Sequence, residues 1–147
     1  MSRTINLRRQ HDAAVDLVKH LATHLDGPAP DKMQAYRIGL DLAKLTGLLR
    51  IHFAIEDRTL YPYMIASTNA AASGTAAAFQ DEMGELGATY SAFAERWNSE
   101  AIVTNFPAFR AEARDVFAAP GNRIERENTI LYPLADAIKA DQARASA

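Results

Sequence analysis

The sequence predicts an all-α protein, an up-down-up-down antiparallel bundle of four long helices. In four segments, apolar residues recur every three or four positions, which is the spacing of one helix face. No segment alternates apolar and polar residues between hairpin turns, as a half-buried strand would. Short loops separate the segments, and such loops make successive helices antiparallel neighbours. The length of 147 residues predicts a single domain over residues 1–147 with room for a core.

The first two helices are predicted from their apolar stripes and from the residues that end them. The first spans residues 6–25 and ends at the Gly-Pro-Ala-Pro sequence of residues 27–30. Asp31 can cap the second helix, which continues to about residue 61 or 64, because Pro62 disfavours helical geometry at Tyr61. The expected inward residues are Leu7, His11, Val15, Val18, Ala22 and Leu25 in the first helix and Ile38, Leu42, Leu45, Leu49, His52, Glu56 and Leu60 in the second.

The second pair of helices follows a central loop that is expected at residues 67–74. The third helix spans residues 75–98, and the fourth begins near Pro107 and continues to about residue 139. Pro120 and Gly121 should kink or break the fourth helix one turn before Arg123. The expected inward residues are Phe79, Met83, Leu86, Tyr90, Phe93 and Trp97 in the third helix and Phe109, Ala113, Val116, Arg123, Glu127, Leu131, Leu134 and Ile138 in the fourth.

Composition excludes several classes of function. A net charge of −2 and a pI near 6.1 provide no basic surface for nucleic acid or for an anionic membrane. The sequence contains neither a run of about 18 apolar residues nor an apolar signal segment at its start, so the expected location is the cytoplasm. The chain has no cysteine, and its strong metal ligands are therefore limited to His, Asp and Glu.

The second helix contains a pair of residues with metal-ligand chemistry. His52 and Glu56 are four positions apart, which places the imidazole and the carboxylate on one helix face, one turn apart. The same stripe contains Leu45, Leu49 and Leu60. The spacing therefore predicts a histidine and a carboxylate inside an apolar seam.

This motif is repeated near the end of the chain with one important difference. Residues 123–133 match residues 52–62, so that Glu127 corresponds to Glu56, and a Leu-Tyr-Pro sequence follows in both. Arg123 stands where the first copy has His52, and a guanidinium has no lone pair to give to a metal. In the preceding helices, His11 lies 41 residues before His52 and Met83 lies 40 residues before Arg123.

With these motifs the chain resembles the hemerythrin-like family, also called the HHE cation-binding domain. The resemblance covers nearly the whole chain and implies a bundle that holds two irons, bridged by Glu56 and Glu127. It implies that His11 and His52 are the terminal ligands of one iron. The ligands of the second iron would stand at Met83 and Arg123, which are not histidines. Because reversible dioxygen binding takes one electron from each of two irons, the sequence argues against an oxygen carrier.

Two inward carboxylates need a positive partner, because an unpaired buried carboxylate costs several kcal/mol. In the first arrangement, His11, His52, Glu56 and Glu127 bind one divalent ion, and Arg123 bridges the same carboxylates in place of a second metal. Iron is the expected ion, with manganese or zinc as alternatives. In the second, no metal binds, Arg123 pairs with Glu127, and a protonated histidine pairs with Glu56. A third arrangement has two metals with unusual ligands such as Glu82 or Glu125.

The leading hypothesis is a metal-binding or sensing protein that is not an enzyme. An iron(II) ion with an open position could bind a small ligand such as nitric oxide or peroxide, and the sequence identifies no protein partner. The main alternative is a metal-free interaction domain that keeps the bundle. Another is a histidine phosphotransfer protein, which would require an exposed His52.

Two further features have interpretations of their own. His20 and His24, with Asp16 one turn before them, are expected to face solvent, and a weak metal site there is the alternative. Tyr61 and Tyr132 are expected at the end of the bundle, with buried rings and hydroxyl groups in water.

Overall fold

The computed structural model describes residues 4–83 and 86–138, and all the secondary structure in these residues is helical. The all-α prediction is thus confirmed. The elements are α1 (Ile5–Leu25), α2 (Lys32–Ile55), η1 (Glu56–Leu60), α3 (Tyr61–Ile65), α4 (Ala70–Met83), α5 (Leu86–Arg96), α6 (Ser99–Thr104), α7 (Phe106–Arg126) and η2 (Glu127–Leu131), and residues 132–138 are also helical. The η elements are π-helices.

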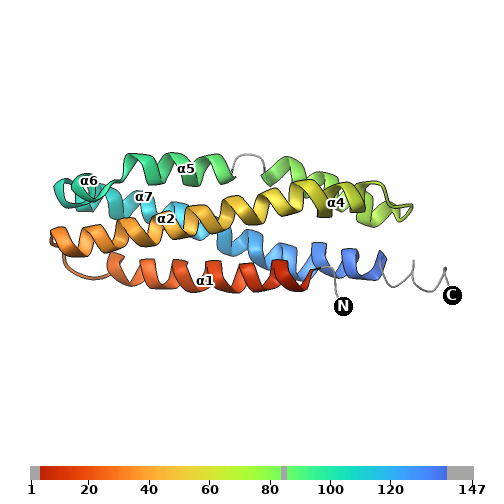
Figure 1. Cartoon of the computed structure of the whole chain (residues 1–147), viewed down its shortest axis with the longest axis horizontal. Helices are drawn as coiled ribbons and strands as arrows, with labels where there is room; N and C mark the ends of the chain where they lie inside the picture. Colours follow the sequence, from red (N-terminus) through yellow and green to blue (C-terminus); the bar gives the residue numbers. More distant parts are fainter. Residues whose placement is uncertain (1–3, 84–85, 139–147) are drawn as a thin grey trace.

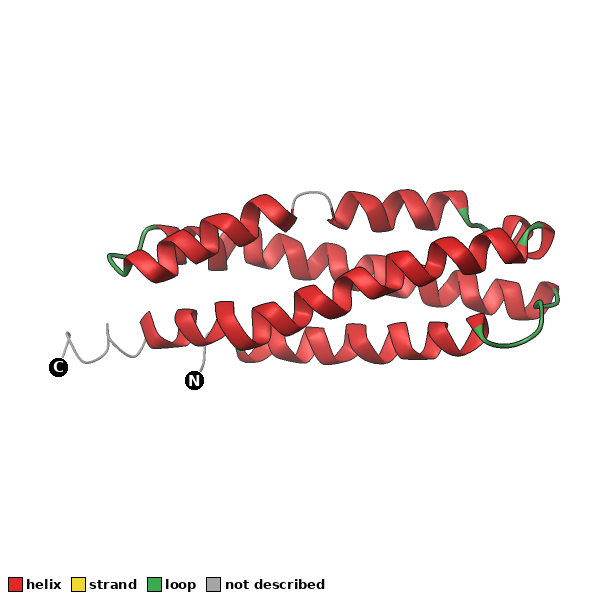
Figure 2. Ribbon diagram, turned by 180° about the vertical axis from the view of Figure 1, so that it is seen from behind, coloured by secondary structure: helices red, strands yellow, loops and turns green. Residues whose placement is uncertain are grey.

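The long helices lie side by side along the longest axis of the molecule (Figure 1). α1 packs against both α2 and α7, and α5 also packs against both α2 and α7. α4 packs against α3, and the short α6 packs against α2 and α7, as the view from behind also shows (Figure 2). The Thr4 hydroxyl lies 3.0 Å from Oδ2 of Asp136, so residues near the two described ends of the chain are neighbours.

Two π-helical turns interrupt the repeated motif at equivalent places, since each begins at its glutamate. The N–H of Tyr61 donates to the carbonyl of Glu56, and that of Tyr132 donates to the carbonyl of Glu127. Pro62 and Pro133 follow these tyrosines, and neither proline has an N–H for the carbonyl four residues earlier. The helix accommodates each proline by a wider turn, a feature that is frequent at functional sites.

Several predicted boundaries differ from the structure because short polar side chains cap helices locally. Asn69 accepts the N–H of Ala72, so α4 begins at Ala70 and residues 70–74 are helical rather than a loop. Asn98 accepts the N–H of Ala101 and starts α6, a helix that the sequence did not predict. The sequence predicted a kink or a break at Pro120-Gly121, and a break does not occur, since α7 runs through these residues.

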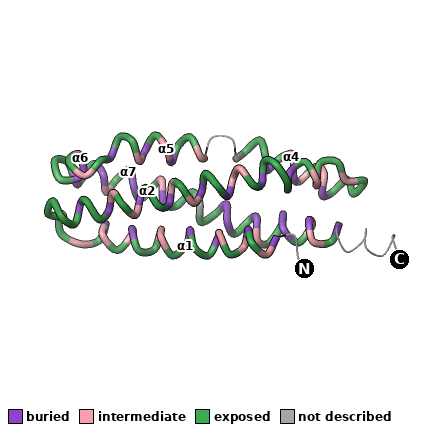
Figure 3. The backbone as a smooth tube through the Cα atoms, in the orientation of Figure 1, coloured by how far each residue is buried: buried purple, intermediate pink, exposed green. Residues whose placement is uncertain are grey.

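The core has two apolar parts with a polar layer between them. One contains Leu21, Leu45, Phe93 and Phe109, and the other contains Leu60, Met64, Phe79 and Ile138. Figure 3 shows that buried positions alternate with exposed ones along each long helix. The buried polar residues of the layer are His11, His52, Glu56, Arg123 and Glu127. Within the described residues, no helix combines the length and the apolar character needed to cross a membrane.

Candidate metal centre

Two histidines face each other at the centre of the polar layer. His11 on α1 is 2% exposed and His52 on α2 is 1% exposed, so both lie inward as predicted. Their Nε2 atoms are 3.0 Å apart. A phosphotransfer role for His52 is excluded, because that reaction requires an imidazole that a partner protein can reach.

The outer nitrogens of both rings are held by side-chain amides. Nδ1 of His52 lies 2.8 Å from Oε1 of Gln10, and Nδ1 of His11 lies 2.9 Å from Oδ1 of Asn128. An amide oxygen can only accept, so each Nδ1 donates and each Nε2 keeps a free lone pair. Sequence reasoning missed both amides, although Gln10 precedes His11 and Asn128 follows Glu127.

The two glutamates complete the centre around the hydroxyl of Tyr132. This hydroxyl lies 3.0 Å from Oε2 of Glu56 and 3.2 Å from Oε2 of Glu127. It is also 3.1 Å from Nε2 of His11 and 3.4 Å from Nε2 of His52. One hydroxyl proton cannot satisfy four acceptors. Oε1 of Glu56 has no hydrogen-bond partner, although it lies 3.1 Å from Nε2 of His52.

The position of Tyr132 corrects the prediction that both tyrosines place their hydroxyl groups in water. Tyr61 and Tyr132 are 0% exposed, and both hydroxyl groups reach the polar layer. In a regular α-helix, a residue five positions after a glutamate is rotated by about 140° from it. In a π-turn, a backbone bond joins these two positions, and the tyrosine moves toward the face of its glutamate. The 100° periodicity used for prediction therefore could not place them inward.

Arg123 lies inside the layer and is 8% exposed. Its Nε donates to Oε1 of Glu127 at 3.0 Å, and its Nη2 donates to the Tyr61 hydroxyl at 2.8 Å and to the carbonyl of Phe79 at 3.0 Å. In the described residues, no hydrogen bond joins Arg123 to Glu56. The first predicted arrangement required the guanidinium to bridge both carboxylates. In the structure it pairs only with that of Glu127 among the two.

Burial dominates the electrostatics of the centre. Burial lowers the pKa of His11. Burial also lowers the pKa of His52 to about 4, opposed by the charge of Glu127 and helped by that of Arg123. Burial also raises the pKa of Glu56. The pKa of Glu127 is raised to about 8 by burial, by its hydrogen bond to Glu56 and by the negative charge of Glu56. Near neutral pH the imidazoles are therefore uncharged, which disfavours the metal-free arrangement built on a protonated histidine.

The donor set fits a metal ion. His11, His52 and Glu127 each offer a ligand atom, and these atoms lie within 4.8 Å of one another. Two nitrogens that bind one ion at about 2.0–2.1 Å are about 3 Å apart when they approach it at roughly a right angle. The unpartnered Oε1 of Glu56 is a further donor beside His52. Two neutral imidazoles cannot hydrogen-bond to each other through two lone pairs, whereas a shared cation satisfies both.

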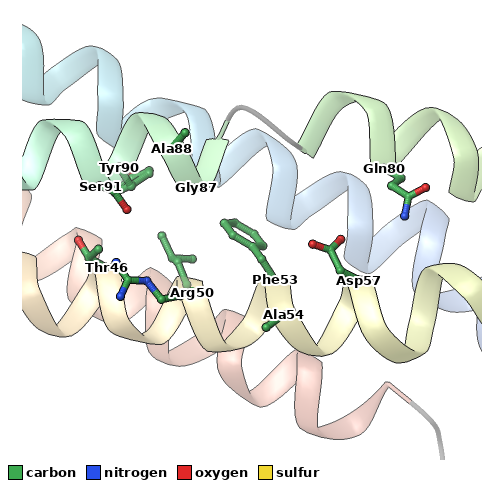
Figure 4. A pocket seen from close by; sticks show the side chains of 11 residues that line it. Thr46, Arg50, Phe53, Ala54, Asp57, Gln80, Gly87, Ala88, Tyr90 and Ser91 are labelled. Carbon is green, nitrogen blue, oxygen red and sulfur yellow. The ribbon is translucent and has the colours of Figure 1, made fainter.

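Two neighbouring cavities lie at or beside this site and share lining residues. A cavity of about 10 Å³ is lined by His11, His52, Phe53, Arg123 and Glu127, among others, and this volume suits about one water-sized particle. A cavity of about 490 Å³ lies between α2 and α5 at the surface (Figure 4). Leu49 and Phe53 line both cavities, and Figure 4 shows Phe53 projecting from α2 toward α5, between Arg50 and Asp57.

The acids suggested for a second metal lie away from this centre. Glu82 pairs with Arg126 at the surface, and Glu125 is exposed. Met83 is the last residue of α4, and its side chain lies outside the part of the chain that the structure describes. The arrangement with two metals and these acids as ligands is therefore wrong.

Comparison with known proteins agrees with the geometry. Searches of curated proteins and of solved structures gave no match. The family model described as the hemerythrin HHE cation binding domain matches residues 4–135, which is most of the chain. A match of this extent, together with the inward histidines and glutamates, shows that the chain belongs to the hemerythrin HHE cation-binding domain family.

Proposed function

We propose that this protein binds a single divalent metal ion through His11, His52 and Glu127, with Glu56 as a fourth ligand. The observation behind this proposal is the 3.0 Å separation of two imidazole nitrogens whose lone pairs face each other. Gln10 and Asn128 hold the rings in the tautomer that a metal requires. Two nitrogens and two carboxylates suit iron(II), with manganese(II) or zinc as alternatives.

We propose that Arg123 replaces the charge of a second metal. Its guanidinium occupies the second-hairpin half of the layer, where it neutralises Glu127 and donates to Tyr61. The hydroxyl of Tyr61 therefore accepts a hydrogen bond from the arginine, while the hydroxyl of Tyr132, its counterpart in the repeat, contacts the histidine pair. The supporting scaffold is an up-down-up-down four-helix bundle, since α1, α2, α5 and α7 form a closed ring of neighbours.

The role proposed for the ion is the binding or sensing of a small ligand such as nitric oxide or peroxide. A bound iron(II) would supply an open position and one electron, which does not suffice for reversible oxygen carriage by the two-electron route. The cavity between α2 and α5 gives a small ligand an approach that ends at Leu49 and Phe53. In this scheme the chain's own residues hold the ion, keep the layer dry and select ligands by size.

Elemental analysis of protein purified without chelators tests the proposal. The expected result is that His52→Ala lowers the bound metal by about one ion per chain, whereas Ile51→Ala does not. Ile51 is 59% exposed on the same helix turn and provides the matched control. Added iron, manganese or zinc should also stabilise the metal-free protein, by about 2.7 kcal/mol at a hundred times the Kd. Equal metal contents and no stabilisation by any of these ions would favour the metal-free interaction domain instead.

A further inference from the structure

A second group of metal-ligating side chains lies on the surface between α1 and α2. His20 and His24 come from α1 and Asp41 from α2, and their ligand atoms lie within 4.8 Å of one another. Nε2 of His20 is 3.2 Å from Oδ2 of Asp41. The two imidazoles meet edge to face, with ring centroids 5.5 Å apart. The carboxylate comes from the neighbouring helix and not from Asp16, which the sequence had suggested.

The packing of the two helices holds this group in place. Leu21 follows His20 and is 1% exposed, while Leu42 follows Asp41 and is 2% exposed. Both leucines belong to the same apolar cluster, so the seam between α1 and α2 fixes the positions of the ligands on its edge. The side chain of Asp41 is only 15% exposed, which limits the rotamers it can adopt.

The chemistry of the group suits a transition metal with open positions. Imidazole nitrogens favour zinc, copper and nickel over magnesium or calcium. The side chain of His20 is 63% exposed, so water can complete the coordination from the solvent side.

We propose that His20, His24 and Asp41 form a second, solvent-facing site for a transition-metal ion that links α1 to α2. His20 is nine residues from His11, which is about 14 Å along α1, so this site shares no ligand with the interior centre. Its occupancy would stabilise the first hairpin directly, because the ion joins two helices. The site does not depend on the function proposed for the interior.

Zinc titration of the 147-residue chain, followed by NMR of its four histidine rings, tests this site. The expected result is that the His20 and His24 signals shift together and saturate with one Zn²⁺ bound at this site. Asp41→Asn should weaken this binding about tenfold or more, because it replaces a charged ligand. Asp16→Asn is the matched control, since it removes an exposed acid from α1, and it should leave the affinity unchanged.

Two outcomes would overturn the proposal. If Asp41→Asn binds Zn²⁺ as tightly as the wild type, the two histidines form an adventitious ion site only. If the His20 and His24 signals do not shift at all, the group binds no ion. Shifts of the His11 and His52 signals report the interior centre separately, so a failure of one site can be distinguished from a failure of the other.

Discussion

Replacement of Arg123 by methionine tests whether this arginine neutralises the buried glutamate. The substitution keeps a long side chain and removes three hydrogen bonds, to Glu127, to Tyr61 and to the carbonyl of Phe79. Removal of one partner from a buried ion pair typically costs about 3–5 kcal/mol. Where Glu127 is charged, the melting temperature of a chain of this size should therefore fall by about 10 °C.

The loss should depend on pH, and its sign follows from the pKa of Glu127. Burial raises this pKa to about 8, so at pH 6 the carboxyl group is protonated and Arg123 contributes only hydrogen bonds, worth about 1–3 kcal/mol. At pH 9 the wild-type carboxylate is largely charged, so the substitution also removes its ion-pair partner and the loss of stability is larger than at pH 6. The pKa of Glu127 is about 8 in the folded protein and lower in the unfolded chain. Between these two pH values the folded protein binds more protons than the unfolded chain, so this group makes the metal-free protein less stable as pH rises toward 8.

The assay is urea unfolding of the wild type and Arg123→Met at pH 6 and pH 9, with a chelator present. Arg126→Met is the matched control, since Arg126 lies three residues further on, carries the same charge and pairs with Glu82 at the surface. The control should change stability little, because exposed ion pairs are screened by water. A loss in Arg123→Met that is the same at both pH values, or no larger than that of the control, would refute the reasoning.

Three further predictions concern metal binding and access to the centre. The apparent metal affinity should rise by up to about tenfold per pH unit toward pH 8 and then level off, because Glu127 must release its proton to bind an ion. Metal titrations that show equal affinity at pH 6 and pH 8 would contradict this. Among the described residues, the Tyr132 hydroxyl is the one that contacts both carboxylates. Tyr132→Phe should therefore cost the metal-free protein about 1–3 kcal/mol in urea unfolding, whereas substitution of the exposed Tyr36 by phenylalanine should cost almost nothing. Equal losses would rule out a role for the shared hydroxyl. Phe53→Ala should open a passage between the two cavities and speed the removal of bound metal by a chelator several-fold. The absorbance of the chelate measures this rate. A rate no faster than that of Ile51→Ala would show that Phe53 is not the barrier.

Much of the helical pattern could be predicted from local sequence. The stripe from Ile38 to Leu60 is buried at every predicted position, because a helix that packs on one side repeats its apolar residues at a fixed interval. The start of α4 and the existence of α6 were missed, since Asn69 and Asn98 cap helices through single side-chain bonds that leave no periodic signal. The helix does not break at Pro120, because apolar residues on both sides of it, Phe117 and Ile124, pack into the same cluster.

The sequence predicted five of the inward polar residues of the candidate site. The contribution of Tyr132 could not be predicted in this way. His11, His52, Glu56, Arg123 and Glu127 are all buried together, as their spacing indicated. The contribution of Tyr132 depends on a π-turn, which shifts the helical phase by an amount that regular periodicity does not contain.

The sequence by itself determined which chemistry each helix can offer. The repeat supplies two glutamates, and the difference between His52 and Arg123 gives lone pairs to one hairpin and a fixed positive charge to the other. Only the tertiary structure decided which of these groups meet. Asn128 reaches His11 across 117 positions of the chain, and Asp41 joins His20 from a different helix. Such pairs depend on how helices are rotated and shifted against one another, and that is set by the packing of whole faces, which no single stretch of sequence encodes.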